Sequence, residues 1–327
     1  MSKFPDASLG SSPSAPKNVA TGMLLAAMGA IAFSGKAIIV KLAYRHQVDA
    51  VTLIMYRMLF ALPLFMGMAW WGTYRQSGGL RMALSRRDWG GIVGLGFSGY
   101  YLASFLDFAG LQYISASLER LILYTTPTLV IGLGWLLYGR TIRRAQVWGM
   151  GISYLGVLLV FGQEVRLDGG NVALGAVLVL LSAVSYAIYL TYSGQLVRRL
   201  GSLRLVGMAT TVACLLCIVQ YVLVRPLNWR AVQVAPEVIW LSLLNATLCT
   251  AVPVLLVMMA IERIGAGATA QTGMVGPMAT ILMGVWILGE PLTIWVGLGT
   301  TLVLLGILVF SRAGGREPLE AIKPQSC

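Results

Sequence analysis

The chain has 327 residues, of which 57% are hydrophobic and 11% are charged, whereas an ordinary soluble domain has about 25% charged residues. A soluble globule could not bury so much apolar surface, so the composition predicts a polytopic helical membrane protein. The net charge of +12 does not indicate nucleic-acid binding, because the basic residues lie in short segments between apolar runs rather than in a basic patch with stacking aromatic residues.

The chain begins with a polar segment, residues 1–19, that is rich in Ser and Pro. It lacks the apolar core of a signal peptide, so we expect a disordered cytoplasmic tail. A second short polar tail, also expected in the cytoplasm, covers residues 313–327.

Between the tails, apolar runs of roughly 20 residues recur, each long enough to cross the hydrocarbon core as a helix. The first five spans are predicted at 20–43, 50–72, 89–112, 114–138 and 146–162. The second five are predicted at 172–196, 203–224, 237–261, 264–288 and 292–311. The expected fold class is therefore an all-α membrane protein with ten transmembrane helices.

The segments between the spans have an uneven share of Lys and Arg. If the amino terminus is cytoplasmic, sixteen basic residues fall on the inner side. Five fall on the outer side, namely Lys41, Arg45, Arg166, Arg225 and Arg230. The positive-inside rule then predicts that both termini face the cytoplasm.

The two sets of five spans match each other at a constant offset of 150 residues. The sequence ISASLERLILYTTPTLVIGLGWLLYGR at 114–140 aligns without gaps with IGAGATAQTGMVGPMATILMGVWILGE at 264–290, and Pro127 coincides with Pro277. Because each repeat has an odd number of spans, the second copy must enter the membrane the opposite way up. Inverted repeats of this kind are typical of secondary transporters, with the substrate site near the midplane.

The duplicated pattern resembles the EamA repeat of the drug/metabolite transporter superfamily. The resemblance rests on the two spans with a mid-helix Pro, on Gly-Glu-Pro-Leu-Thr at 289–293 and on a last span ending in LLGILVF at 304–310. It implies a ten-helix permease of the bacterial inner membrane, most often an exporter of amino acids or other small metabolites. The implied repeats cover 20–162 and 172–312.

The first copy departs from the family pattern at one point. Gly139-Arg140-Thr141 stands where the family usually has Gly-Glu. An Arg at this position suits an inner loop, and a role that the family gives to this carboxylate does not transfer to this half.

Five acid or base side chains lie well inside the predicted spans, and all belong to the first repeat. They are Lys36, Arg57, Asp107, Glu119 and Arg120. Each lies about four to eight residues from the outer end of its span, or roughly 6–12 Å at the rise of an α-helix, so they form one layer. A charge at this depth costs a few kcal/mol, and such residues face the interior, pair with one another or line a pathway.

Neutral polar residues are expected to complete a substrate-binding site with these charges. At the aligned positions of the second repeat, Thr269 and Ala270 replace Glu119 and Arg120. The neutral residues lie at helical spacing on faces that mix rings with hydroxyls. They are Tyr100, Ser104, Tyr124, Ser185, Tyr186, Tyr189, Asn245 and Gln271.

The charges also have structural interpretations. Arg57 and Asp107 could form a buried clamp between the second and third spans, and long side chains near the interface could snorkel to it. Glu119 and Arg120 are adjacent and point about 100° apart, so both cannot face one lumen squarely. We expect Arg120 to face the lumen and Glu119 to pair with a neighbouring helix.

The matched prolines predict a hinge in each repeat. A Pro in a helix lacks its own N–H and displaces the carbonyl four residues back, here Leu123 and Gly273. Freed carbonyls at the midplane are tolerated where they line a cavity, and the kink can act as a hinge. The hinge residues are then Pro127, Gly273, Gly276 and Pro277, and the alternative is a static packing kink.

These features predict a secondary transporter with a central cavity between the repeats. A site of this charge suits a zwitterion or an organic anion, with Arg or Lys binding a carboxylate and Asp107 or Glu119 binding an amine. No P-loop pattern occurs, so ATP is not expected to drive transport directly. Proton antiport through one of these carboxylates and exchange without a proton both stay open. A nucleotide-sugar or vitamin carrier of the same superfamily is the alternative.

Other function classes have little support in the sequence. The single His46 lies in an outer loop, and Cys214 and Cys217 lie in an apolar span, so neither a catalytic group nor a metal site is expected. A receptor or scaffold would carry a larger soluble domain. We expect no cofactor and no nucleic-acid partner, and a monomer or homodimer in the bilayer.

Overall fold

The computed structural model describes residues 17–76, 84–139, 142–168, 171–225, 234–273 and 275–314, so most of both predicted tails lies outside the described residues. All regular structure in these residues is helical. Eight helical segments are long and apolar enough to cross a membrane, and two shorter apolar helices follow them. The predicted all-α fold with ten spans is therefore confirmed.

The first repeat begins with two uninterrupted helices, α1 (Lys17–Tyr44) and α2 (Ala50–Gln76). Its third span consists of α3 (Arg86–Gly96), the π-helical segment η1 (Phe97–Leu102) and α4 (Ala103–Leu111). Its fourth span consists of α5 (Ala116–Leu123) and α6 (Thr126–Tyr138), and its fifth is α7 (Arg144–Asp168).

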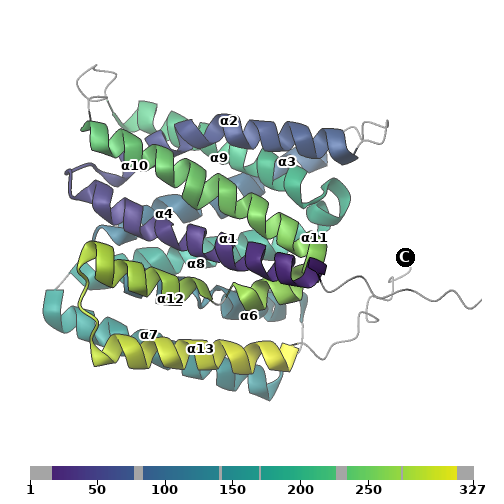
Figure 1. Ribbon diagram of the computed structural model, residues 1–327. Coiled ribbons are helices and arrows are strands. Elements are labelled where there is room, and N and C mark those ends of the chain that lie inside the picture. Colours follow the sequence, from purple (N-terminus) through teal and green to yellow (C-terminus); the bar gives the residue numbers. More distant parts are fainter. Residues whose placement is uncertain are drawn as a thin grey trace, which may run out of the picture.

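The second repeat begins with α8 (Asn171–Leu200) and α9 (Ser202–Val224). Its third span consists of α10 (Pro236–Ala246), the π-helical segment η3 (Thr247–Ala251) and α11 (Val252–Thr272). Its last two spans are α12 (Val275–Met283) with the π-helical segment η4 (Gly284–Leu288), and α13 (Ile294–Gly314). Figure 1 shows the start of α1 and the end of α13 at the same end of the bundle.

Irregular features recur at matched positions of the two repeats. The segments η1 and η3 begin 150 residues apart, at Phe97 and Thr247. Gly139 and Gly289, at the same offset, have left-handed φ angles of 62° and 75°, a conformation that favours glycine at a helix end. The fourth span is interrupted after Leu123, and in the second repeat α11 ends at Thr272, so that each helix stops just ahead of the aligned proline. The internal repeat therefore extends to the backbone.

The repeats differ where the fourth and ninth spans begin. In the first repeat a loop precedes α5, and the Ser115 hydroxyl caps that helix by accepting a hydrogen bond from the Leu118 N–H at 3.0 Å. In the second repeat α11 continues as helix to Thr272, so the break predicted between 261 and 264 is wrong. Gly265 stands at the position of Ser115. Without a capping side chain there, nothing local favours a new helix start over continuation.

Helix α1 forms part of the interface between the repeats. This helix packs against α10, α11 and α12 of the second repeat and against α4 and α5 of the first. In Figure 1, α7 and α13 lie side by side along one edge of the bundle, and α2 packs with α9 at the opposite edge. A Cβ at Gly156 of α7 would meet the Gly299 carbonyl of α13, so small residues permit this close helix contact.

Candidate functional site

Three of the predicted charges form an ion-pair network inside the bundle. Lys36 Nζ in α1 lies 2.5 Å from Asp107 Oδ2 in α4 and 3.3 Å from Glu119 Oε1 in α5. The three residues are 6%, 2% and 0% exposed. One ammonium group therefore serves two carboxylates, and it joins the first, third and fourth spans.

Arg120 adds a second cation beside Glu119. Its Nε lies 3.9 Å from Glu119 Oε2, and its guanidinium carbon lies 5.6 Å from the centroid of the Phe33 ring, which Lys36 Nζ also approaches at 5.6 Å. Nε and Nη2 of Arg120 are buried and have no hydrogen-bond partner among the described residues. Because a guanidinium presents its donors as a planar fork, these groups suit a carboxylate ligand.

Arg57 has a different partner from the one expected. Its Nε and Nη2 donate to the Thr250 hydroxyl of η3 at 3.3 and 3.1 Å, and its guanidinium carbon lies 5.0 Å from the Phe108 ring centroid. Thr250 donates in turn to the Asn245 carbonyl at 2.8 Å, five residues back. The alternative interpretation of Arg57 as a clamp on Asp107 does not hold among the described residues, because that carboxylate pairs with Lys36 of α1. Arg57 instead links the second span to the eighth, across the two repeats.

The layer of charges has hydrogen-bonding capacity that the described residues do not use. Buried polar atoms in proteins nearly always have partners. Here the buried atoms that lack a hydrogen bond within the described residues include Arg57 Nη1, Asp107 Oδ1, both Glu119 carboxylate oxygens, Arg120 Nε and Nη2, and Asn245 Oδ1. A buried group of unpaired donors and acceptors is a candidate site for a ligand that carries both signs of charge.

The two helix breaks face each other across the repeat interface. The Tyr124 hydroxyl, at the end of α5, donates to the Gly273 carbonyl at the end of α11 at 3.1 Å. The Leu123 carbonyl accepts a hydrogen bond from the Thr126 hydroxyl at 2.6 Å. The two carbonyls that we expected the prolines to free are therefore both hydrogen-bonded. The spans are interrupted rather than kinked, because Pro127 lies in the first turn of the new helix α6, where its missing N–H costs nothing.

Gly276 makes room for this contact between the breaks. A Cβ at Gly276 would lie 2.8 Å from the Tyr124 hydroxyl and 3.3 Å from Ser34 Oγ. Ser34 of α1 donates to the Gly276 carbonyl at 2.8 Å. Pro277 is buried, whereas Pro127 is exposed. Three of the four predicted hinge residues thus lie at the repeat interface, and Pro127 lies outside it.

The predicted tyrosines form a second group, on the third and sixth spans. The Tyr100 and Tyr189 hydroxyls are 3.2 Å apart, and their ring centroids lie 5.1 Å apart at an edge-on angle of 69°. Tyr186 stacks on Tyr189 with centroids 5.5 Å apart. Tyr100 precedes Asp107 by two helical turns, so this aromatic group lies roughly 10 Å along the helix axis from the charges.

Two other predicted residues have different surroundings. Ser185 donates to the Ser98 carbonyl of η1 at 2.7 Å, so its hydroxyl satisfies the backbone of the third span. Ser104 is partly exposed in α4. The side chain of Gln271 lies outside the described residues, as do Arg140 and Thr141. The structure therefore brings together the charges with Asn245, and the tyrosines separately.

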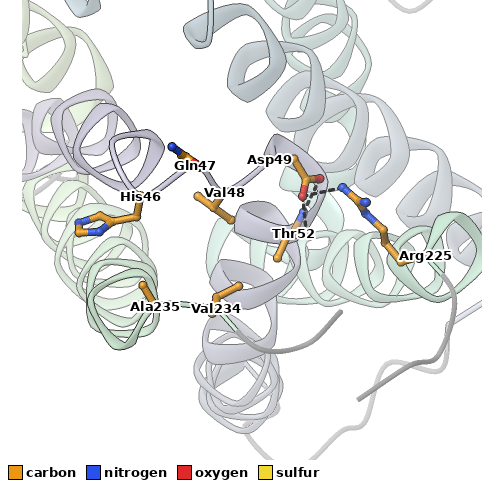
Figure 2. A pocket seen from close by; sticks show the side chains of 8 residues that line it. All are labelled: His46, Gln47, Val48, Asp49, Thr52, Arg225, Val234 and Ala235. Carbon is orange, nitrogen blue, oxygen red and sulfur yellow. Dashed lines mark hydrogen bonds and ion pairs between the residues drawn. The ribbon is translucent and has the colours of Figure 1, made fainter. Parts of the chain in front are cut away.

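A pocket of ≈ 250 Å³ lies where α1 turns into α2. Figure 2 shows Asp49 pointing toward Thr52 and Arg225 at its rim, with His46 on the other side. Its lining consists of His46, Gln47, Val48, Asp49, Thr52, Arg225, Val234 and Ala235, none of them a predicted site residue. We call this end of the bundle, which the sequence predicts to be the outer one, the His46 end.

An ion pair closes one side of the pocket. Arg225 Nη2 lies 2.7 Å from Asp49 Oδ1, which also accepts a hydrogen bond from the Thr52 hydroxyl at 2.7 Å. Partial burial raises the pKa of Asp49, but the hydrogen bonds and the cation outweigh it, so the pKa lies below its ordinary 3.8. The hydrogen bond to Asp49 raises the pKa of Arg225. Both groups are ionised at neutral pH, so the pair ties α2 to the end of α9.

Sequence reasoning did not identify Phe33, Ser34 and Thr250. Thr250 could have been found, because it aligns with Tyr100 at the repeat offset. Phe33 lies one helical turn before Lys36, the spacing at which a ring and a cation meet on one helix face. Ser34 has no signal of this kind, because its partner is a backbone carbonyl of a distant helix.

Comparisons with known proteins agree with this architecture. A family model described as "EamA-like transporter family" matches residues 20–162 and 173–312. The chain is 30% identical over 286 residues to "Uncharacterized transporter YcbK" of Bacillus subtilis (strain 168), which covers 84% of this chain and 88% of that protein. It is 25% identical over 238 residues to "Uncharacterized transporter YyaM" of the same organism, covering 71% and 76% of the two chains.

One solved structure has the same fold. It is a crystal structure that superposes with a TM-score of 0.60 over 91% of this chain and 98% of its own, at 17% sequence identity. At this identity the likeness concerns the fold alone.

Proposed function

Because the chain belongs to the EamA-like transporter family, we propose that it exports amino acids or similar small zwitterionic or anionic metabolites by alternating access between its two repeats. The chain is a multi-pass membrane transporter and not an enzyme. Its substrate is a small molecule, and its surroundings are the lipid bilayer. We propose three further properties: the class of substrate, the direction of transport and the mechanism of transport.

The observation that carries the proposal is the buried layer of charges at the repeat interface. Burying an ionised side chain without full pairing is costly, so a protein retains such groups inside a membrane where they serve a pathway. Within the described residues, Arg57 and Arg120 have donors without a hydrogen bond, and Asp107 and Glu119 have acceptors without one. A ligand with a carboxylate and an ammonium group satisfies both sets.

The roles follow from the positions of the charges. Arg120 binds the cargo carboxylate, because two of its guanidinium nitrogens, Nε and Nη2, lack a hydrogen bond within the described residues. Asp107 and Glu119 bind the cargo ammonium group, which takes the place of Lys36. The tyrosine group of Tyr100, Tyr186 and Tyr189 lines the path on the far side of the charges. A lipophilic monocation fits poorly, because three cations of this layer would repel it.

The proposal also includes the orientation of the chain in the membrane and the coupling of transport to protons. We place the chain in the bacterial inner membrane with both termini in the cytoplasm, which follows from the positive-inside bias of its loops. Where a proton drives export, Glu119 is its carrier, because Lys36 Nζ lies 2.5 Å from Asp107 and 3.3 Å from Glu119, so the ion pair with Glu119 is the looser of the two. An imposed pH gradient that leaves the export rate unchanged would exclude this coupling and favour exchange.

The test is transport by purified protein in liposomes. The probes are labelled neutral amino acids, a dicarboxylate, a nucleotide sugar and tetraphenylphosphonium. We expect uptake of at least one amino acid or of the dicarboxylate, and a loss of about tenfold or more in Arg120→Ala and Asp107→Asn, as for removal of a charged hydrogen-bond partner. Arg166→Ala, which removes an exposed arginine at a helix end, should keep the wild-type rate.

Three outcomes would count against the proposal. Uptake of the nucleotide sugar alone would favour the other carrier class. Uptake of tetraphenylphosphonium alone would contradict the charge argument. Wild-type rates in both Arg120→Ala and Asp107→Asn would remove the charges from the binding site.

A further inference from the structure

The amino terminus of α5 is held by two carboxylates from distant parts of the chain. Glu290, from the second repeat, accepts hydrogen bonds from the Ala116 N–H at 2.7 Å, the Ser117 N–H at 3.3 Å and the Ser117 hydroxyl at 2.7 Å. Glu164, from α7, accepts hydrogen bonds from the Ser115 N–H at 3.2 Å and from the Ser115 hydroxyl. One of these ties therefore lies within the first repeat, and the other joins the two repeats.

The Glu290 tie suits the chemistry of a helix start. The first N–H groups of a helix have no partner within it, and the helix dipole favours negative charge there. The carboxylate fits because Gly284 lacks a side chain: a Cβ at this position would lie 2.8 Å from Glu290 Oε2. At the same end of the bundle, Arg45, in the turn directly after α1, donates to the Leu288 carbonyl at 2.9 Å. The His46 end is thus closed by contacts between the repeats.

The tie is close to the charged layer. Glu119 and Arg120 lie only two and three residues after Ser117, in the same short helix. A movement of the start of α5 therefore moves both charges relative to Lys36 in α1. This makes the carboxylate of Glu290 a positioning group for the layer, although it does not touch those side chains.

The opposite end of the bundle lacks the sequence for an equivalent tie. Arg140 occupies the position of Glu290 in the first repeat, and Gly265 and Gly267 occupy those of Ser115 and Ser117. The helix α11 passes through this region without a new start, so no free N–H groups await a carboxylate there. The tie is therefore a property of one end only.

We propose that Glu290 is the latch of the gate at the His46 end, and that its hydrogen bonds to Ala116 and Ser117 break each time this end opens. The latch holds the two repeats together while it positions Glu119 and Arg120 against Lys36. Glu164 stays on α5 throughout, because it belongs to the same repeat. This inference rests on the alternating access of the proposed function.

The test measures access to a buried cysteine from each side of the membrane. Cys249 is 4% exposed and lies beside Gly35 of α1 at the repeat interface. The reporter protein keeps Cys249, carries Ala at Cys214 and Cys217 and Ser at Cys327, and is first shown to transport. A membrane-impermeant thiosulfonate is added to vesicles of both orientations, and the labelling rate is measured. The latch variants are Glu290→Gln, Ser117→Ala and Gly284→Ala.

We expect Cys249 to react about fivefold faster from the His46 side in Glu290→Gln, as for a lost charged hydrogen bond, and more slowly from the opposite side. Gly284→Ala should have the same effect while keeping the carboxylate, because the added methyl group displaces it. Glu237→Gln is the matched control, since Glu237 is an exposed carboxylate in the first turn of α10. It should leave both rates unchanged.

The outcomes separate this inference from the proposed function. Unchanged labelling in all three latch variants would overturn the latch, and so would an equal rise from both sides, which indicates general loosening. Neither result affects a measured amino-acid uptake by the wild-type protein. Conversely, a one-sided rise in labelling with no amino-acid or anion transport would keep the latch and reject the cargo class.

Discussion

The fourth span, α5 with α6, and its counterpart in the second repeat, the end of α11 with α12, share a backbone break and differ in chemistry. Both are interrupted just before the aligned prolines, and Tyr124 at one break hydrogen-bonds to Gly273 at the other. Only the first copy has a separate capped helix start, and only it carries charges, Glu119 and Arg120. The duplication has thus kept the helix break and changed the charges, which the proposed function treats as the hinge and as the groups that bind the cargo.

This difference has a physical reason. A break in matched helices preserves the symmetry that two opposite-facing states require. Under the proposed function a charged binding layer needs no such symmetry, because the cargo would occupy one site in both states. Duplicated charges would instead add a second desolvation cost of several kcal/mol for each ion.

The largest effect on stability and transport is expected when the charge of Lys36 is removed, which makes the first repeat as neutral as the second at this position. Lys36→Met leaves Asp107 and Glu119 buried together without their ammonium group, which should lower the stability by about 3–5 kcal/mol and abolish transport. Thermal unfolding in detergent measures the first effect. The double variant Lys36→Met with Asp107→Asn should regain part of the lost unfolding temperature, but it should not regain transport. A Lys36→Met protein that melts like the wild type would show that the network does not carry this charge balance.

A smaller loss of stability is expected when Arg57 of the first repeat loses its hydrogen-bond partner in the second repeat. Thr250→Val removes the acceptor of Arg57 and leaves a buried guanidinium with fewer hydrogen bonds, at a cost of about 1.5–3 kcal/mol. Thr247→Val, in the same π-helical segment, removes a hydroxyl that bonds to its own helix at Leu243. Equal destabilisation by the two variants in urea or thermal unfolding would mean that the contact between the repeats adds nothing.

The shared break can be tested by removing its hydrogen bond. Tyr124→Phe should cost about 1 kcal/mol and reduce the transport rate, because the two breaks no longer hold each other. Gly276→Ala should reduce the rate as well, since its methyl group would crowd the Tyr124 hydroxyl. Tyr192→Phe, at an exposed tyrosine of α8, is the control. A wild-type rate in both Tyr124→Phe and Gly276→Ala would contradict a role of the break in the transport cycle.

The smallest effect concerns the ion pair at the pocket, outside the charged layer. The pKa of Asp49 is lowered in the folded protein, so its contribution to stability is present above the ordinary pKa of the free side chain and is lost as the pH falls through the lowered value. Asp49→Asn should therefore lower the unfolding temperature slightly at neutral pH and not at the acid end of the titration. High salt should reduce the difference, because the pair faces solvent. A difference that is independent of pH would contradict this assignment.

Much of the fold could be predicted from the sequence, because membrane spans follow from hydropathy and the repeat follows from alignment. The five charges were also expected in one layer, and the structure brings Lys36, Asp107, Glu119 and Arg120 together. Their pairing could not be predicted, because it depends on the tilt and rotation of each helix, which neighbouring helices determine.

Two features of the ends of the spans were beyond the sequence pattern. Helix α11 continues through the predicted loop because no capping side chain starts a new helix there. Hydropathy predicts a loop at this point because a charged residue, Arg263, interrupts the apolar run. In the sequence, Glu290 is recognisable only as part of a family motif, whereas its hydrogen-bond donor, the Ala116 N–H, lies 174 residues away. Contacts of this range leave no periodic trace in the sequence.

The matched π-helical segments have a consequence for the rotational register of the third and eighth spans. A π turn holds one more residue than an α turn in nearly the same length of helix, so deleting one residue within η1 would convert it to an ordinary α turn and keep the residues after it in register. Asp107 would then still face Lys36, whereas deleting one residue of the regular helix α4 ahead of Asp107 would rotate that carboxylate by about 100°. A single-residue gap at η1 in a relative is therefore compatible with the same interior, and a gap in α4 ahead of Asp107 is not.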